Sequence, residues 1–308
     1  MRFSFSDEQL ALRDALGNLL AKECTPAHVR AAWTNETGRV PGLWEQLAGM
    51  GVIGMLAPES EGGIGLTFVD LVLVLEETGR HAVPEPIVET AAFGIPLVGR
   101  TDITIAAGEP WVPWAHTADL IFTTGGRYHR DQVELVAHAS VDGARRLFEV
   151  RGAPEPGAAT EEEARAALDR ATCGIAAQQC GLADRMLEMT ADYVRERKQF
   201  GLPVGSFQAV KHHLANARIA LEFARPLVYR AAASITEGDP DAAVHASMAK
   251  AQADAAALQT GRAALQCHGA IGYTTEYDLH LFMKRSWALA RSWGDRTFHH
   301  GRVRRAIL

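Results

Sequence analysis

The sequence predicts a mixed α+β fold with three parts: an N-terminal helical domain over residues 1–90, a shortened middle β-domain over 91–158, and a C-terminal four-helix bundle over 159–308. In the outer parts, apolar residues recur every three to four positions, which is typical of amphipathic helices. The middle part instead has short β-branched runs separated by Gly, Pro and Asp. A strand–helix–strand rhythm is absent from the sequence, which argues against a doubly wound parallel sheet.

The N-terminal part contains signals for several helices. Ser6 followed by Gln9 has the form of a capping box, and leucines follow at helical spacing from Leu10 to Leu20. Residues 41–55 restart a helix that glycines end, and 57–70 form a glycine-rich loop. Another helix begins near residue 71, and we expect Gly79 and the two prolines after it to end that helix.

The middle part predicts a small antiparallel β-domain. Four runs carry the prediction because each is β-branched or alternating and is bounded by turn residues: 101–108, 118–126, 133–140 and 146–152. Helical periodicity returns at Thr160, which forms a second capping box with Glu163. A long apolar stripe then runs to Tyr193, and further helices are predicted over 206–237 and 240–267, near Glu276 and after Trp293.

Composition excludes several classes of function. The formal net charge is −6, which argues against a nucleic-acid surface. The longest apolar run is too short to span a bilayer, and the N-terminus lacks a signal-peptide core. The four cysteines have no CxxC pairing and the 12 histidines are scattered, so we expect a reduced, cytoplasmic protein without a metal site.

The stretch from residue 195 to 224 is unusual for a helix end. Arg197 precedes Phe200 and Gly201, the helix breaks, and a second helix starts near Gln208. Positive charge near a helix C-terminus is ordinary, because it complements the helix dipole. The pattern therefore fits a plain helix end with a buried Phe as well as a contact for an anionic ligand.

Four segments in order resemble the acyl-CoA dehydrogenase family: 3–16, 43–80, 195–224 and 264–286. The third resembles the family's arginine-x-x-phenylalanine-glycine motif with a downstream phenylalanine-glutamine. The fourth, which includes "QCHGAIG", resembles its glutamine-x-x-glycine-glycine element. The resemblance implies that these motifs reach the adenosine-diphosphate half of FAD bound by a neighbouring subunit. The residues it assigns to this contact are Arg197, Phe200, Gln208, Gln266, Gly269 and Ala270.

Each assigned residue would have a distinct role in that contact. Arg197 would donate to pyrophosphate oxygens and Phe200 would pack on the flavin's apolar surface. Gln208 would hydrogen-bond near the adenine. Gln266 and the backbone at Gly269 and Ala270 would complete the wall of the cofactor site, since a glycine backbone allows the cofactor to approach closely.

The family's catalytic base is absent from both of its common positions. The family removes an α-proton with a carboxylate while hydride leaves the β-carbon for the flavin. Trp293 occupies one glutamate position, and Ala171, 26 residues before Arg197, occupies the other. Asp295 and Asp169 each lie two residues away, about 200° around a helix, so neither is a simple substitute. Asp295 is the remaining, weak candidate.

The family's threonine-glutamate-proline and glycine-serine-aspartate loop is also expected to be missing between Ile87 and Gly157. The resemblance therefore implies a non-catalytic short subunit of an α2β2 acyl-CoA dehydrogenase, of the type used in actinobacterial steroid degradation. A longer partner would carry the catalytic Glu, the substrate would be an acyl-CoA, and an electron-transferring flavoprotein would take the electrons. Two alternatives stay open: a self-sufficient homo-oligomeric dehydrogenase with Asp295 as base, and a structural scaffold that has lost the cofactor.

Overall fold

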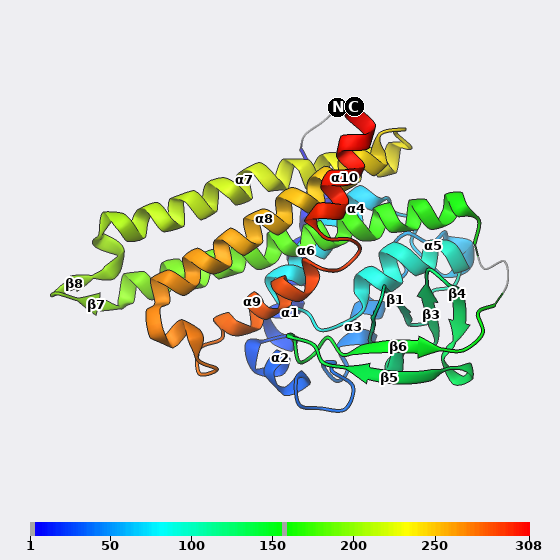
Figure 1. The fold of residues 1–308 in the computed structure, drawn as a ribbon, viewed down its shortest axis with the longest axis horizontal. Coiled ribbons are helices and arrows are strands. Elements are labelled where there is room, and N and C mark those ends of the chain that lie inside the picture. The colour runs from blue at the N-terminus through cyan, green and yellow to red at the C-terminus, as the bar shows by residue number, and fades with distance from the viewer. Residues whose placement is uncertain (1–3, 156–158) are drawn as a thin grey trace.

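The computed structural model describes residues 4–155 and 159–308 (Figure 1). The N-terminal part is helical, and Ser6 and Gln9 form the predicted capping box at its first helix. Its helices are α1 (Asp7–Glu23), α2 (Pro26–Ala32), α3 (Leu43–Gly49), α4 (Phe68–Arg80), the π-helix η2 (Val88–Gly94) and α5 (Ile95–Val98), with a 3₁₀ turn η1 (Glu59–Glu61). The helical run therefore continues to Val98, and the first strand begins at Ile105.

The helix α4 ends at Arg80, one residue after Gly79, close to the predicted end, and Gly79 also lets α4 cross α6 closely. A Cβ added to Gly79 would lie 2.2 Å from the carbonyl oxygen of Gln178, and one added to Gly181 would lie 1.9 Å from that of Glu76. The two backbones therefore meet where neither helix has a side chain.

The middle part folds as two three-stranded sheets with strand orders β1-β3-β4 and β2-β6-β5. The strands are β1 (Ile105–Ala107), β2 (Val112–Pro113), β3 (Leu120–Thr123), β4 (Gly126–His129), β5 (Glu134–His138) and β6 (Leu147–Arg151), with 3₁₀ turns η3 (Ala115–Thr117) and η4 (Arg130–Gln132).

The antiparallel prediction is wrong for one strand pair, because β1 and β3 pair in parallel. The segment between them contains β2 and η3 and is long enough to return the chain in the same direction, which a hairpin cannot do. Strand β4 was not predicted either, since its Gly-Arg-Tyr-His sequence reads as part of a turn.

The C-terminal part is a bundle of long helices, with the predicted capping box at Thr160 and Glu163. Its elements are α6 (Glu161–Glu196), β7 (Lys198–Gln199), β8 (Leu202–Pro203), η5 (Val204–Ser206), α7 (Gln208–Glu237), α8 (Ala242–His268), η6 (Gly269–Tyr273), α9 (Leu279–Leu289) and α10 (Arg296–Ile307). Alanines at the α8 interface are fully buried, among them Ala246, Ala249 and Ala253, which allows close packing on α6 and α7. Figure 1 shows the small β-hairpin β7–β8 projecting at one end of this bundle, away from the β-domain.

Membrane spans and metal clusters are both absent from the described residues. Across residues 4–155 and 159–308, no helix has the length and apolar character required to cross a membrane. Within the same ranges, no three or more His, Cys, Asp or Glu side chains gather in a way that could hold a metal ion.

Candidate functional site

The hairpin after α6 holds Phe200 out into solvent. Gln199 pairs with Leu202, so Phe200 and Gly201 form a two-residue turn, with φ values of 52° and 80°. Hairpins of this length favour positive φ at both turn residues, which suits Gly but strains a bulky side chain. The Phe200 residue is 92% exposed, and its ring contacts that of Phe207 edge-on at 6.2 Å between centroids. The expectation of a buried Phe at a plain helix end is therefore wrong.

Polar side chains beside this hairpin are exposed and unpartnered. Arg197 is the C-cap residue of α6, and Gln208 is the first residue of α7. Neither side chain makes a hydrogen bond or an ion pair with any residue that the structure describes. The neighbouring Arg195, in contrast, pairs with Asp192. The two donors are thus free to bind a ligand from outside the chain.

The end of α8 lies at the same end of the bundle. Tyr193 on α6 stacks on His268 at 4.4 Å between ring centroids and donates to its backbone oxygen at 3.3 Å. Gln266, Gly269 and Ala270 around this helix end are exposed. At Gly269 φ is 66° and ψ is −141°, a conformation that is essentially restricted to glycine, and an added Cβ would meet no atom within 4 Å.

The structure therefore gathers the six predicted contact residues at one end of the bundle, on two neighbouring chain segments. All six are exposed: Arg197, Phe200, Gln208, Gln266, Gly269 and Ala270. This open surface presents free donors, a projecting aromatic ring and a bare glycine backbone to a ligand from outside the chain. It is not a closed pocket that would bury a cofactor in this chain alone.

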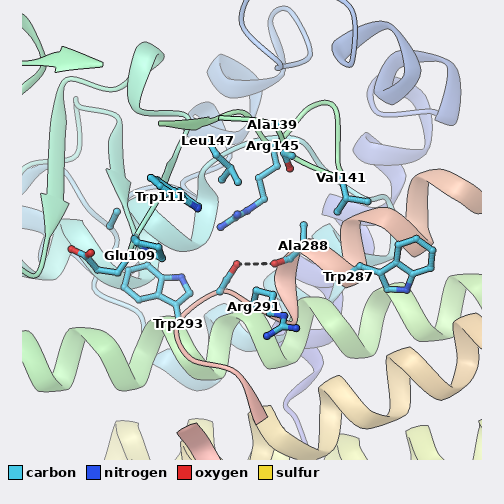
Figure 2. A pocket seen from close by; sticks show the side chains of 15 residues that line it. Glu109, Trp111, Ala139, Val141, Arg145, Leu147, Trp287, Ala288, Arg291 and Trp293 are labelled. Carbon is cyan, nitrogen blue, oxygen red and sulfur yellow. Dashed lines mark hydrogen bonds between the residues drawn. The ribbon is translucent and has the colours of Figure 1, made fainter. Parts of the chain in front are cut away.

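A second candidate region is a cavity of about 380 Å³ between the β-domain and the segment joining α9 to α10 (Figure 2). Its lining comes from three stretches that are distant in sequence: residues 107–111, 139–147 and 287–293. Figure 2 shows Arg145 pointing into it, with Trp111, Leu147 and Trp293 around the guanidinium.

Neither expected base position holds an acid that faces this cavity. Trp293 lines it, with a backbone φ of 58°, and its indole packs against the Phe93 ring at 4.9 Å between centroids, tilted by 35°. Ala171 is fully buried in α6. Asp169 is buried and bonded to Arg302, so it is engaged in an ion pair.

Asp295 caps α10. Its carboxylate accepts from the backbone N–H of Phe298 at 3.0 Å, and Arg291 lies 3.4 Å away. The Phe298 N–H lowers the pKa of Asp295, with a smaller effect from Arg291. Asp295 is not among the residues that line the cavity. This geometry favours a capping role over proton abstraction.

The cavity also contains a feature that the sequence prediction missed. Glu109-Pro110 follows β1 and lines the cavity, reproducing the last two residues of the family's threonine-glutamate-proline motif with Gly108 in the threonine place. The expectation that the complete loop is missing between Ile87 and Gly157 stays a prediction. The signal was visible in the sequence, but the loop has no glycine-serine-aspartate after it.

Most of the chain matches models of a single protein family. Residues 6–98 match the family described as acyl-CoA dehydrogenase, N-terminal domain, and residues 162–308 match acyl-CoA dehydrogenase, C-terminal domain. Two curated relatives named acyl-CoA dehydrogenase IpdE2 are each 32% identical: one from Mycobacterium tuberculosis, over 92% of this chain and 92% of the relative, and one from Mycolicibacterium smegmatis, over 94% and 95%.

Solved structures agree with this assignment. The ChsE4-ChsE5 complex from Mycobacterium tuberculosis superposes with a TM-score of 0.86 at 25% identity, over 100% of this chain and 99% of that chain. A butyryl-CoA dehydrogenase from Megasphaera elsdenii superposes with a TM-score of 0.84 at 21% identity, covering 100% of both chains, which shows the shared fold. On its sequence matches and its fold, this chain belongs to the acyl-CoA dehydrogenase family.

Proposed function

We propose that this chain is the short, non-catalytic subunit of a heteromeric FAD-dependent acyl-CoA dehydrogenase, which introduces an α,β double bond into an acyl-CoA thioester. The observation that carries the proposal is the hairpin tip, where the Phe200 ring is 92% exposed on a positive-φ turn beside the unpartnered Arg197. Strain of this kind costs roughly 1–3 kcal/mol and is kept where function needs it.

The proposed role of the exposed residues is to bind and orient the adenosine-diphosphate half of FAD held mainly by a partner subunit. Arg197 would donate two parallel hydrogen bonds to pyrophosphate oxygens. Phe200 would cover an apolar face of the cofactor, and Gln208 and Gln266 would hydrogen-bond its adenosine end. When bound, FAD supplies the hydride acceptor for the β-carbon.

The catalytic base would come from the partner. The two family positions hold Trp293 and Ala171 here, and neither side chain can take a proton. Asp295 is engaged in capping α10. A longer subunit with the catalytic Glu would therefore complete the one working site of each pair.

The assembly and substrate are finer parts of the same proposal. The ChsE4-ChsE5 structure is a complex of two proteins, and this supports a heteromeric α2β2 arrangement for the present chain. We propose a bulky, steroid-derived acyl-CoA as substrate, on the resemblance to heteromeric family members, and an electron-transferring flavoprotein as electron acceptor in the cytoplasm.

Flavin content tests this proposal. The chain is purified alone and with the product of an adjacent acyl-CoA dehydrogenase-like gene, and bound FAD is read from its absorbance near 450 nm. We expect one FAD per pair and little in the chain alone. Arg197→Ala should weaken FAD binding to the complex about 10- to 100-fold, the loss of one or two charge-assisted hydrogen bonds. Arg195→Ala, two residues away and paired with Asp192, is the matched control and should bind normally.

Two outcomes would favour the alternatives. A chain that by itself holds one FAD and desaturates an acyl-CoA, and that loses turnover on Asp295→Asn, would be a self-sufficient dehydrogenase. A colourless complex with a flavin-competent partner would instead indicate a structural scaffold.

A further inference from the structure

A buried arginine points into the cavity between the β-domain and the α9–α10 segment. Arg145 lies just before β6 and is 7% exposed. Figure 2 shows its guanidinium directed into the space between Trp111, Leu147 and Trp293. The group is therefore shielded from bulk water but faces a cavity of about 380 Å³.

The Arg145 guanidinium lacks hydrogen-bond partners. The Arg145 side chain donates no hydrogen bond to any residue within 4–155 and 159–308. Its Nε atom is fully buried and has no hydrogen-bond partner. The nearest acid oxygen, Oε1 of Glu89, lies 3.9 Å from Nη2, too far for a hydrogen bond. A buried donor without a partner is costly, so such groups usually bind water, an ion or a ligand.

Neighbouring charges are mostly engaged elsewhere. Arg285 forms an ion pair with Asp142 and donates to the backbone oxygen of Val83. The carboxylate of Glu109 accepts from the backbone and hydroxyl of Thr124. Glu89 is the counter-ion of Arg145, at 3.9 Å, but its carboxylate does not reach hydrogen-bond distance of the guanidinium. The Arg145 guanidinium therefore keeps donors that no neighbouring group takes up as hydrogen-bond partners.

The walls and mouth of the cavity are aromatic. Trp111, Trp287 and Trp293 line it, and the first two are 38% and 41% exposed at its mouth. Arg291 lines it as well, with an exposed side chain. Indole faces offer broad apolar contact to a flat ring, while an arginine fork matches the planar geometry of a carboxylate.

We propose that this cavity binds a monocarboxylate with a flat, apolar ring body. The carboxylate accepts two parallel hydrogen bonds from Arg145, and the ring lies among the tryptophans, with its far end at the mouth. The volume is within the range of small-ligand pockets. The lining includes Trp293, at the family's glutamate position, and Glu109-Pro110, so the inference rests on the proposed function, under which this chain holds no flavin of its own.

Calorimetric titration of the full chain, with its partner where the two co-purify, tests the proposal. The probe is 2-naphthoate, and 2-naphthamide is its neutral control of nearly the same shape. We expect the acid to bind about 10- to 100-fold more tightly, because only the acid gains charge-assisted hydrogen bonds. Equal binding of the two, or tighter binding of 2-naphthyl phosphate than of the acid, would overturn the carboxylate assignment. This comparison needs no variant, and the flavin content of the chain alone separates a failure of this inference from a failure of the proposed function.

Variants locate the site. Arg145→Gln should remove the preference for the acid over the amide. Ala139→Trp should weaken binding of both probes, because Ala139 is an exposed residue of the lining and a large side chain there narrows the mouth. Arg151→Gln is the control, since Arg151 is an exposed arginine of β6 that pairs with Glu149. Unchanged binding in Ala139→Trp would place the acid outside the cavity and refute the proposal, even if Arg145→Gln fails to fold.

Discussion

At the scale of single residues, the exposed aromatic Phe200 is the clearest departure from what folding alone would select. Its φ of 52° lies in the left-handed region, where Asn or Gly is preferred before the Gly of a two-residue hairpin. The residue is 92% exposed, and its ring contacts only the partly exposed ring of Phe207 among the aromatic pairs of the described residues. A chain selected only for stability would place Asn there, which is why we assign the ring to a contact outside this subunit.

Phe200→Asn should therefore separate stability from cofactor binding. Relief of the left-handed strain should leave the free energy of unfolding unchanged or raise it by about 1 kcal/mol. FAD should leave the complex faster, since the aromatic contact is lost. Denaturant unfolding of the variant and stopped-flow release of FAD from the complex give the two quantities. A variant that is destabilised and keeps normal FAD release would show that the ring serves the fold instead.

At the scale of elements, the crossing of α4 and α6 fixes how the N-terminal helices sit on the bundle. Gly79 and Gly181 each face a backbone carbonyl of the other helix. Arg80 and Arg225 then reach Asp184 beside the crossing, with Arg225 also bonded to Glu76. The glycines thus set the distance at which these charged groups meet.

Gly181→Ala should be strongly destabilising, because its Cβ would lie 1.9 Å from a backbone oxygen that cannot move without shifting α4. We expect a loss of about 3 kcal/mol in the free energy of unfolding. Gly261→Ala in α8 is the matched control, because its added Cβ would have its nearest neighbouring atom at 3.7 Å. The better helix propensity of Ala should therefore raise the free energy of unfolding by up to about 1 kcal/mol. Chemical denaturation of both variants checks this; similar effects would mean that the α4–α6 crossing tolerates a wider spacing.

At the scale of the whole molecule, the C-terminal segment is anchored to the bundle by buried polar groups. His299 on α10 is fully buried, and its Nε2 lies 3.0 Å from the Trp293 carbonyl oxygen while its Nδ1 lies 3.2 Å from the Ser247 hydroxyl. The carbonyl can only accept, so Nε2 carries the proton and Nδ1 accepts from Ser247. Burial, with a further effect from nearby Lys250, lowers the pKa of His299 to about 4.

This depressed pKa makes stability depend on pH. Between the unfolded pKa, about 6.5, and the folded value of about 4, the unfolded chain binds the extra proton, so stability falls as the pH falls. Glu85, whose pKa burial raises to about 7, acts in the opposite direction. The contribution of Glu85 is the same in wild type and in His299→Gln, so it cancels when the two proteins are compared.

His299→Gln should lower the free energy of unfolding by about 1–3 kcal/mol at pH 7, where the hydrogen bonds of His299 in the native protein are intact. The loss should shrink toward pH 5, because the variant has no imidazole to protonate on unfolding. Urea unfolding at both pH values measures this difference. A loss that stays constant or grows on acidification would mean that His299 is protonated in the folded state.

Much of the fold could be predicted from local sequence signals. The capping boxes at Ser6 and Thr160 and the long helical periodicities predicted α1 and the long helices α6, α7 and α8, because caps and amphipathic stripes depend on residues three or four apart. The parallel pairing of β1 with β3 could not be predicted, since it depends on where a long connection returns the chain. The role of Gly79 in the crossing of α4 and α6 could not be predicted for the same reason, since Gln178, whose backbone it approaches, is distant in sequence.

The sequence by itself determined the family, through motifs at both ends of the chain, and the absence of an acid at the two base positions, because these are matters of residue identity. Only the tertiary structure decided that the six predicted cofactor contacts share one exposed end of the bundle, since α6, α7 and α8 run alongside one another. Only the tertiary structure, likewise, shows that Arg145, Trp111 and Trp293 line one cavity. Those residues come from segments that meet only through long-range packing. Burial, which makes a guanidinium without hydrogen-bond partners costly, is a property of the folded chain.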